Sequence, residues 1–409
     1  DGAGRHRVGT MLISHRTSVV ARLGTAQTLA WASSYYLPAM LATAMAADLG
    51  VSVTTVFAAF SFALIVSAVF GRWAGQLIDH HGGRPVLIGT NLLFAAGLLA
   101  LSLAQGPVLL FLAWGLIGVA MAAGLYDAAF ATLVRLYGHD ARSTITGITL
   151  IAGFASTVGW PLTAWLELEF GWRGACLCWA GLHLLLGLPL NASLPRSTAA
   201  PGVSPVPAAV SPTDAPAPAP AAAPGATFWP TVLLSLVFAV TWFTSTAMAA
   251  HLPSLLQAHG LTLAAALALA ALVGPAQVAA RLLEFGFLRK VHPLLSAQLA
   301  TAAHPLGAVL LMVVGGPAAL LFTVLHGAGN GILTIAKGTL PLVIFGPKGY
   351  GARQGLLMVP ARVAQAFAPL VFGLAIDRFG GGALWVSTGV GLVGLAALVW
   401  LQRSGSVVR

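Results

Sequence analysis

Four charged residues lie inside long apolar stretches of this chain: Asp127, Arg281, Lys337 and Arg362. A charged side chain at the centre of a lipid-spanning helix costs about 2.5–3.5 kcal/mol, so such residues normally face a cavity or a charged partner. Three cations against one acid favour a cavity that binds an anion. A carboxyl group in such a cavity can take up and release a proton, which makes Asp127 a candidate for coupling transport to a proton gradient.

Each of these charges also has a purely structural interpretation. Arg281 can pair with Glu284, three residues later on the same helix face, and extend toward the cytoplasm. Lys337 can extend to a membrane surface in the same way, and Asp127 can be a hydrogen-bonding group between helices. Arg362 lies closest to the middle of its stretch, so it is the strongest candidate for a ligand contact.

Aromatic and neutral polar residues complete the predicted substrate site. Tyr36, Trp242 and Asn330 are candidates for contact with a solute, although aromatic rings in such stretches also serve in packing. The histidines inside apolar stretches fall in four different stretches without metal-ligand spacing and are expected to be core residues; they are His183, His251, His304 and His326. The sequence predicts no metal site and no cofactor.

The composition identifies the solvent of these stretches. Of the 409 residues, 58% are hydrophobic and 7% are charged, where a soluble domain has about 25% charged residues. This excludes a soluble globular enzyme, because its surface would lack charged cover. The net charge of +10 reflects scarce acids rather than a basic stripe, so no nucleic-acid partner is expected. Cys176 and Cys178 point to different sides of a helix, and no disulfide is expected.

Twelve runs are long enough to cross about 30 Å of hydrocarbon as helices. They fall into two groups of six, separated by a segment rich in Pro, Ala, Ser and Thr that reads as a tether. The runs are Gly24–Ala46, Thr55–Ala74, Pro85–Ala104, Val108–Leu133, Ser143–Leu166, Trp172–Leu190, Phe228–Leu252, Leu261–Phe287, Leu294–Val314, Pro317–Phe345, Gly355–Ile376 and Ala383–Leu401.

These runs predict five regions along the chain. They are an N-terminal segment (1–23), a six-helix bundle (24–190), a Pro/Ala-rich linker (191–227), a second six-helix bundle (228–402) and a short tail (403–409). Of the 20 Lys and Arg residues, most fall on the side of the N-terminus, and Arg173 and Arg378 fall on the other. The positive-inside rule therefore predicts that both termini and the linker are cytoplasmic. No signal peptide is expected, and residues 1–10 before Met11 are expected to be an extension.

The two groups of six runs repeat one another at an offset of roughly 208–211 residues. Trp31 in the first run corresponds to Trp242 in the seventh, and Pro161 in the fifth corresponds to Pro369 in the eleventh. Parallel six-helix repeats of this kind form two bundles with a cavity between them near the bilayer midplane.

The loop between the second and third runs carries a specific motif. It reads Gly-Gln-Leu-Ile-Asp-His-His-Gly-Gly-Arg-Pro over residues 75–85. This resembles the signature loop of the major facilitator superfamily, with departures at His80 and Gly83. The matching positions are Gly75, Leu77, Asp79, Gly82 and Arg84. The resemblance covers the whole chain and implies an all-α membrane protein of twelve transmembrane helices in two parallel-repeat bundles, working by alternating access.

The resemblance also implies a conformational lock at the cytoplasmic ends. Gly75 would let its helix approach a neighbour closely, and Asp79 and Arg84 would form charge pairs that hold the ends of the first bundle together. The alternative is an ordinary loop whose Arg84 obeys the positive-inside rule. In the second half, Glu284 and Arg289 repeat the five-residue spacing of Asp79 and Arg84, whereas another alignment sets Arg281 against Arg72; both stay open.

Subfamily signals are weaker. Drug–proton antiporters of the superfamily carry an Arg in the fourth span, where this chain has Trp114, and their Pro/Gly motif is only partly present at Gly159 and Pro161. Arg281, with Gln277 one turn earlier, is similar to the Arg with which monocarboxylate transporters hold a carboxylate, although their preceding residue is an acid.

We therefore expect a gradient-driven secondary transporter in a bacterial inner membrane, and not an enzyme, because no zinc, nucleophile-elbow or phosphate-loop motif is present. The expected substrate is a small organic anion such as a carboxylate, held by Arg362, Arg281 and Lys337 and coupled to protons through Asp127. The expected partners are this substrate, protons and lipid, with the protein a monomer. The alternatives are proton-coupled efflux of drugs or hydrophobic cations and, more distantly, a membrane sensor of the same fold.

Overall fold

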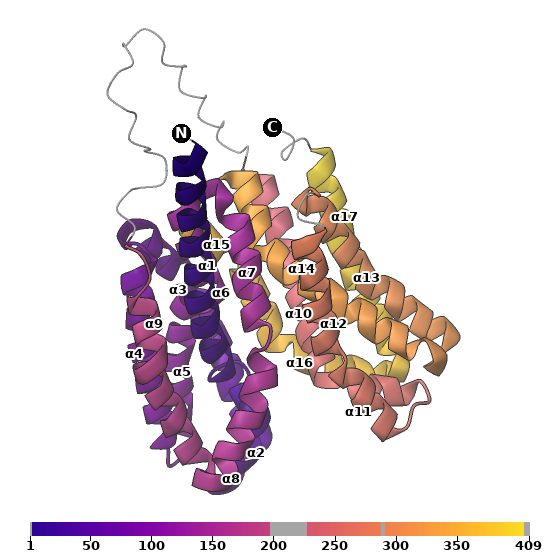
Figure 1. Cartoon of the computed structure of the whole chain (residues 1–409). Helices are drawn as coiled ribbons and strands as arrows, with labels where there is room; N and C mark the ends of the chain where they lie inside the picture. The colour runs from indigo at the N-terminus through magenta and orange to yellow at the C-terminus, as the bar shows by residue number, and fades with distance from the viewer. Residues whose placement is uncertain (1, 197–226, 288–290, 405–409) are drawn as a thin grey trace.

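The computed structural model describes residues 2–196, 227–287 and 291–404, and it describes the side chains from residue 15 onward, except that of residue 267. The described segments are α-helical apart from short turns (Figure 1). The elements of the first half are α1 (Gly2–Ala32), α2 (Leu37–Leu49), α3 (Val53–His81), α4 (Gly83–Ser102), α5 (Pro107–Gly124), α6 (Tyr126–Tyr137), α7 (Arg142–Ala152), α8 (Ala155–Leu182) and α9 (Leu188–Ala192).

The second half repeats this organisation after the linker. Its elements are α10 (Phe228–Ala258), α11 (Leu263–Ala271), α12 (Val273–Gly286), α13 (Pro293–Val314), α14 (Ala319–Phe345), α15 (Tyr350–Leu357), α16 (Val359–Phe379) and α17 (Leu384–Arg403). The start of α1 and the end of α17 lie at the same end of the molecule, which we call the termini end; the opposite end is the distal end (Figure 1).

Eight helical stretches among the described residues are long and apolar enough to cross a membrane. Two of them, Pro107–Ala192 with 86 residues and Tyr350–Arg403 with 54 residues, exceed the roughly 20 residues of one crossing several-fold. They fold back on themselves, the first of them partly at Gly171, where φ is 70°. A positive φ is accessible to glycine at little cost, so α8 reverses direction there without a loop.

Several of the expected runs are divided into two helices. The first run breaks at the buried residues Ser33 and Ser34, between α1 and α2. The fourth breaks at Leu125, whose backbone is extended (φ −90°, ψ −167°). The eighth and eleventh break at Leu272 and Met358. Such breaks free backbone groups inside the membrane region, where they can be satisfied by neighbouring helices or line a cavity.

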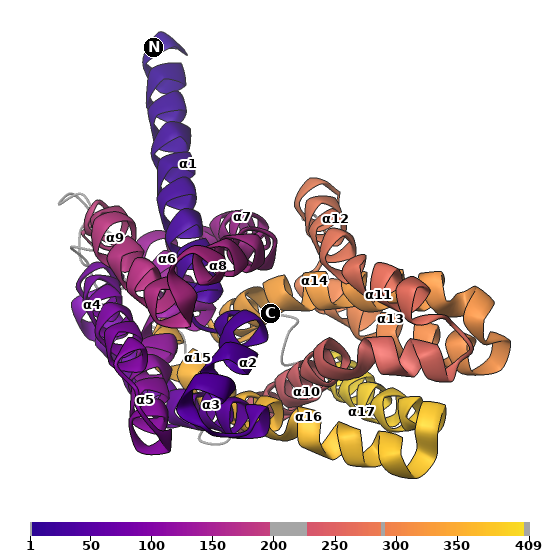
Figure 2. The same ribbon diagram turned by 90° about the horizontal axis from the view of Figure 1, so that it is seen from below.

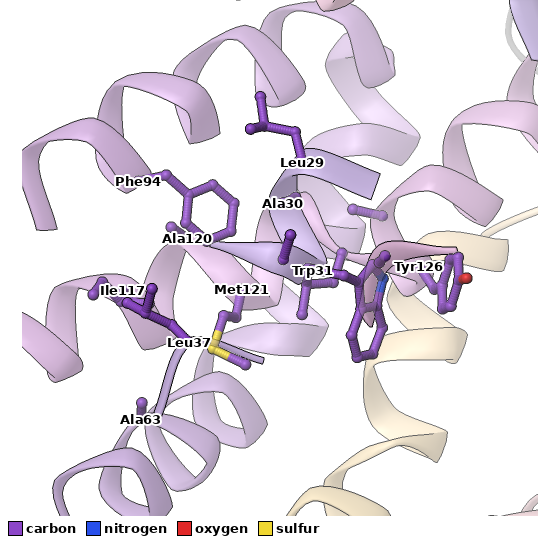
Figure 3. Packing of buried hydrophobic residues seen from close by; sticks show 14 of the residues in the cluster. Leu29, Ala30, Trp31, Leu37, Ala63, Phe94, Ile117, Ala120, Met121 and Tyr126 are labelled. Atoms are coloured by element: carbon purple, nitrogen blue, oxygen red, sulfur yellow. The ribbon is translucent and has the colours of Figure 1, made fainter. Parts of the chain in front are cut away.

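The apolar core differs between the halves. One cluster runs through the first half and includes Trp31, Phe94 and Tyr126 (Figure 3). The second half has two separate clusters, one around Leu234 and Leu398 and the other around Met248 and Phe322. The segment of α10 that lies between these two clusters carries polar residues, so the interior of the second half contains a polar layer.

The two halves lie side by side and touch along two seams (Figure 2). In the first seam α3 packs against α15 and α16, and in the second α7 packs against α12 and α14. In the first seam, a Cβ atom added to Gly75 would collide with the backbone of Gly351, and one added to Gly355 would collide with the backbone of Gly71. Only glycine permits this backbone-to-backbone approach, as in other membrane helix pairs.

Candidate functional site

Asp127 lies in the first turn of α6, directly after the break at Leu125. The break matters because the unpaired N–H groups of a helix start favour a negative charge. Asp127 also lies where the first half faces the second. The sequence analysis placed Asp127 inside a continuous run, because the hydrophobic pattern does not show the break at Leu125.

Asp127 binds two cations that come from the other half of the molecule. Its Oδ1 atom lies 3.0 Å from Nζ of Lys337 on α14, and its Oδ2 atom lies 3.0 Å from Nη2 of Arg362 on α16. The Lys337 and Arg362 side chains are 1% and 3% exposed. A buried ion pair is favourable only when its geometry is good and its remaining groups are hydrogen-bonded. This triad carries one surplus positive charge.

Two glutamines extend the triad into a network. Gln354 of α15 donates from Nε2 to Asp127 Oδ1 (3.3 Å) and to the carbonyl of Lys337 (3.3 Å). Arg362 donates to Oε1 of Gln365 (3.5 Å), which in turn donates to the hydroxyl of Tyr35 at the break in the first run (3.3 Å). The network therefore joins both halves through groups that are nearly all buried.

Aromatic rings from both halves surround the ammonium group of Lys337. Its Nζ atom lies 5.0 Å from the ring centre of Trp242, 5.6 Å from that of Tyr126 and 5.7 Å from that of Phe130. Cation–π attraction within about 6 Å stabilises such a buried charge. Tyr126 also packs against Trp31, with ring centres 4.9 Å apart (Figure 3), so the core of the first half supports this site directly.

Arg281 lies apart from the triad and binds neutral acceptors. It is 4% exposed, and it donates to the backbone carbonyls of Thr149 (3.0 Å) and Gly331 (3.3 Å) and to the Thr334 hydroxyl (3.4 Å). None of the contacts that the described residues make with it involves a carboxylate. Tyr36 and Tyr126 lie close enough to interact with Arg281 electrostatically. Arg281 is thus a buried guanidinium whose charge is solvated by dipoles only.

Comparison of the sequence with known families agrees with this arrangement. A family profile described as Major Facilitator Superfamily matches residues 23–315. The chain belongs to the Major Facilitator Superfamily. It is therefore a multi-pass membrane protein of a secondary transporter family, and not an enzyme.

Individual proteins resemble the chain to different extents. An uncharacterized 38 kDa protein from Thermoproteus tenax is 30% identical over 365 residues, covering 89% of this chain and 90% of that protein. Human monocarboxylate transporter 2 is 30% identical over 144 residues, 34% of this chain and 28% of the transporter. A chloramphenicol efflux pump of Mycobacterium tuberculosis is 32% identical over 167 residues, 39% of each chain.

Solved structures confirm the expected fold class of the superfamily. The proton:xylose symporter XylE aligns with a TM-score of 0.71 and 13% identity, covering 95% of this chain and 96% of that chain. At this identity the likeness concerns the fold alone. The all-α architecture predicted from the twelve runs is confirmed.

The superfamily signature loop contacts the second half through the Asp79 side chain and the first half through the Asp79 backbone. Asp79 accepts hydrogen bonds from the backbone N–H groups of Gly351 (to Oδ1, 2.9 Å) and Ala352 (to Oδ2, 2.9 Å) in α15. Arg135 donates to the carbonyl of Asp79. The expectation that Asp79 and Arg84 hold the ends of the first bundle together by charge pairs differs from this arrangement: Arg84 takes part in none of the ion pairs among the described residues. A carboxylate matches the first N–H groups of a helix, so a helix start can replace the second charge.

Glu284 likewise crosses between the halves. Its Oε1 atom lies 3.0 Å from Nη2 of Arg142 in α7, and Arg142 also donates to the carbonyl of Val291 (3.1 Å). The interpretation in which Glu284 pairs with Arg281 on the same helix does not describe this state, because Arg281 points to Thr149. Arg289, the other expected lock residue of this half, lies outside the described residues.

The remaining site candidates lie at different places. Trp242 contacts Lys337, and Tyr36 belongs to the aromatic group around Trp31, with ring centres 6.2 Å apart. Asn330 lines a small cavity inside the second half together with His304 and His326. The site thus gathers Asp127, Lys337, Arg362 and Trp242, with Arg281 and Tyr36 on one side and Asn330 on another.

Sequence reasoning missed several residues of the site. Gln354 and Gln365 were not singled out, although an uncharged amide inside an apolar run is a weaker form of the same signal as a charge. Arg142 was counted only as a topological charge. The histidines were treated as separate core residues, and the contact between His304 and His326 has no signal in their spacing of 22 residues.

Proposed function

We propose that this chain is a secondary transporter of a small organic anion, such as a carboxylate, that works by alternating access. The observation that carries the proposal is the charge balance of the buried site: two cations, Lys337 and Arg362, share the one carboxylate of Asp127, and a third cation, Arg281, binds only neutral acceptors. A buried guanidinium that has no carboxylate partner strongly favours the binding of an anionic ligand, to which it can donate two parallel hydrogen bonds.

Arg281 is the residue best placed to hold the substrate carboxylate. Arg362 and Lys337 already bind Asp127, so an incoming anion must compete for them, whereas Arg281 needs to exchange only bonds to carbonyl and hydroxyl groups. Tyr36 and Trp242 are proposed to contact the rest of the solute. The partial similarity to human monocarboxylate transporter 2 supports the same substrate class.

Asp127 is proposed to couple transport to protons by controlling the contact between halves. As a carboxylate it ties α6 to α14 and α16 by two ion pairs. A proton on Asp127, or an anion on Lys337 or Arg362, removes these attractions and leaves the halves freer to separate at mid-depth. Since a ligand moves a conformational equilibrium only by binding the two states differently, this competition supplies the required difference.

Orientation follows from the distribution of basic residues. Both termini and the linker are proposed to be cytoplasmic, in a bacterial inner membrane. The described state would then be closed toward the cytoplasm, because the two seams with Asp79 and Glu284 lie at the termini end. The protein is proposed to act as a monomer.

The test is thermal stabilisation of the purified protein by small carboxylates, organic cations and neutral solutes, because a ligand that binds only the folded state raises the melting temperature. Carboxylates are expected to stabilise the wild type by about 2.7 kcal/mol when their concentration is 100 times Kd. They are expected not to stabilise Arg281→Gln. Arg173→Gln, which alters an exposed ion pair at the distal end, is the control and should respond as the wild type does. Stabilisation by anions regardless of Arg281 would contradict its role.

The runner-up is proton-coupled efflux of drugs or hydrophobic cations. The partial similarity to the chloramphenicol efflux pump favours it, and Asp127 would then be the group that binds the cation. Stabilisation by organic cations in the same panel, lost in Asp127→Asn, would replace the anion proposal with this one.

For the anion proposal, liposomes holding Asp127→Asn should fail to accumulate the stabilising carboxylate under an imposed pH gradient, while exchange at equal pH persists.

A further inference from the structure

A pair of histidines lies in the polar layer between the two apolar clusters of the second half. The Nδ1 atom of His304 on α13 lies 3.0 Å from the Nδ1 atom of His326 on α14. The two side chains are buried, with exposures of 7% and 4%. At this distance one Nδ1–H group donates to the lone pair of the other ring, so the neutral pair holds one shared hydrogen bond.

The pair borders a small cavity of about 30 Å³, a volume that can hold one or two water molecules. Nε2 of His304 and Oγ1 of Thr244 are buried there without a hydrogen-bond partner. Unsatisfied buried polar atoms are uncommon in folded proteins and usually indicate water, an ion or a functional role. Thr241, Thr301 and Asn330 also line the cavity.

A third buried histidine shows what a structural role looks like in the same chain. His183 of the first half has both ring nitrogens in contact with a partner: Nε2 lies 2.7 Å from the Ser33 hydroxyl, and Nδ1 lies 3.0 Å from Oδ1 of Asn91. His304 differs because its Nε2 atom is buried without a hydrogen-bond partner, in a residue that lines the cavity. The difference distinguishes a ring that is fully used in packing from one that can exchange a proton with water.

We infer that His304 and His326 form a proton-binding site in the second half, separate from Asp127. A proton delivered by cavity water adds to the free Nε2 lone pair of the ring whose Nδ1–H donates. The Nδ1–H···Nδ1 bond stays intact, and both Nε2 atoms then carry hydrogen. The positive charge spreads over two rings instead of one, and the cavity water and Thr244 accept from the new N–H group.

No charged side chain of the surrounding described helices is free to replace this proton. On α10, His251 binds the carbonyl of Pro369, and on α14 Lys337 binds Asp127. On α12, Arg281 binds Thr149 and Glu284 binds Arg142. The basic residue of α17, Arg403, lies at the last turn of that helix, away from the level of the pair.

The position of the pair links it to the transport site. His326, Asn330 and Lys337 are 4 and 7 residues apart along α14, a spacing that puts all three on one helix face. The face leads from the cavity to Lys337 over about 16 Å. A charge gained at the pair therefore changes the electrostatic environment of the Lys337–Asp127 contact along one rigid helix, independent of which solute the transporter carries.

The test measures proton uptake by the purified protein in nanodiscs, with an indicator dye, when the pH is lowered from about 7.5 to about 3 in about half-unit steps. The wild type is expected to take up about one more proton per molecule than His304→Gln or His326→Gln. His183→Gln is the matched control and should equal the wild type. Equal uptake by the wild type and both pair variants would overturn the proton site.

Folding of the variants is checked separately. Thr244→Val keeps both rings and the size of the cavity wall but removes a partner for the new N–H group, so its uptake should lie between those of the wild type and His304→Gln. Thr244→Val keeps both rings. If it took up no more protons than a folded His304→Gln, the rings would have no effect on proton uptake, and this result would also contradict the site. None of these outcomes depends on substrate, so they are separable from the carboxylate test.

Discussion

The termini end and the distal end of the molecule are held by different kinds of contact. At the termini end, Asp79 binds the backbone of α15 and Arg142 binds Glu284, so the contacts cross between the halves. At the distal end, Asp48 accepts from Trp172 (3.0 Å) and from Arg173 (2.9 Å), all within the first half. Likewise α2 packs on α3 and α8, and α11 packs on α10, α12 and α14.

Under the proposed alternating access, this difference indicates which end must change during transport. Ionic and backbone contacts across the halves have to break when the termini end opens, whereas the distal contacts stiffen one half and can persist through the whole cycle. A rocking movement of two rigid halves about a central site is the general mode of transporters built from repeats.

The largest effect on this comparison is expected from Gly75→Val. A Cβ atom at Gly75 collides with the backbone of Gly351, and overpacking of this kind costs about 1–3 kcal/mol or more. The closed termini end should lose at least about fivefold in population relative to the open one. The measurement is the distance between spin labels at His81→Cys and Lys348→Cys, in a background lacking Cys176 and Cys178.

Gly89→Ala is the control for that experiment, because a Cβ atom at Gly89 meets no neighbour within 4 Å. It should leave the label distances unchanged. Unchanged distances with Gly75→Val would mean that the seam between α3 and α15 does not close this end.

A smaller effect in the same direction is expected from Glu284→Gln. The change removes the ion pair with Arg142 while keeping the size of a side chain that is 5% exposed. Because an ion pair across the second seam is lost, the open population should rise, but less than with Gly75→Val, since the first seam stays intact. Glu169→Gln, at an exposed position of the distal end, should behave as the wild type in the same label experiment.

The smallest effect is expected from Asp48→Ala. Its ion pair with Arg173 is 49% and 37% exposed, and exposed pairs contribute about 0–1 kcal/mol. The melting temperature should fall slightly, and the label distances at the termini end should not change. A shift in these distances would show that the distal network is coupled to closure, and the contrast between the two ends would then be wrong.

The fold could be predicted from sequence to a greater depth than the site. Apolar runs and a parallel repeat are imposed by the thickness of the hydrocarbon, so the twelve runs predicted the fold class, and the signature loop predicted the superfamily; both are confirmed. The breaks at Leu125 and Met358 were not predicted, because hydropathy continues through them. They depend on whether neighbouring helices satisfy the freed backbone groups.

The partners of the site residues could not be predicted from the sequence, for a related reason. Charge counting identified Asp127, Lys337 and Arg362, but which carboxylate meets which cation depends on the packing of the two halves. Asp79 illustrates the limit most clearly: its partners are two backbone N–H groups, and a backbone group has no sequence signature. The site residues otherwise stay predictions that the variants above can test.

The bond between Asp79 and the start of α15 has a consequence for how the protein can diversify. Because the carboxylate contacts main-chain atoms, the closure of the termini end places little demand on the side chain at Ala352, and only the need for close approach restricts Gly351. Apart from Gly355, which approaches Gly71 closely, other positions of this eight-residue helix are less restricted by closure, and they include Gln354 beside Asp127. Selectivity can drift while the mechanical cycle is inherited unchanged.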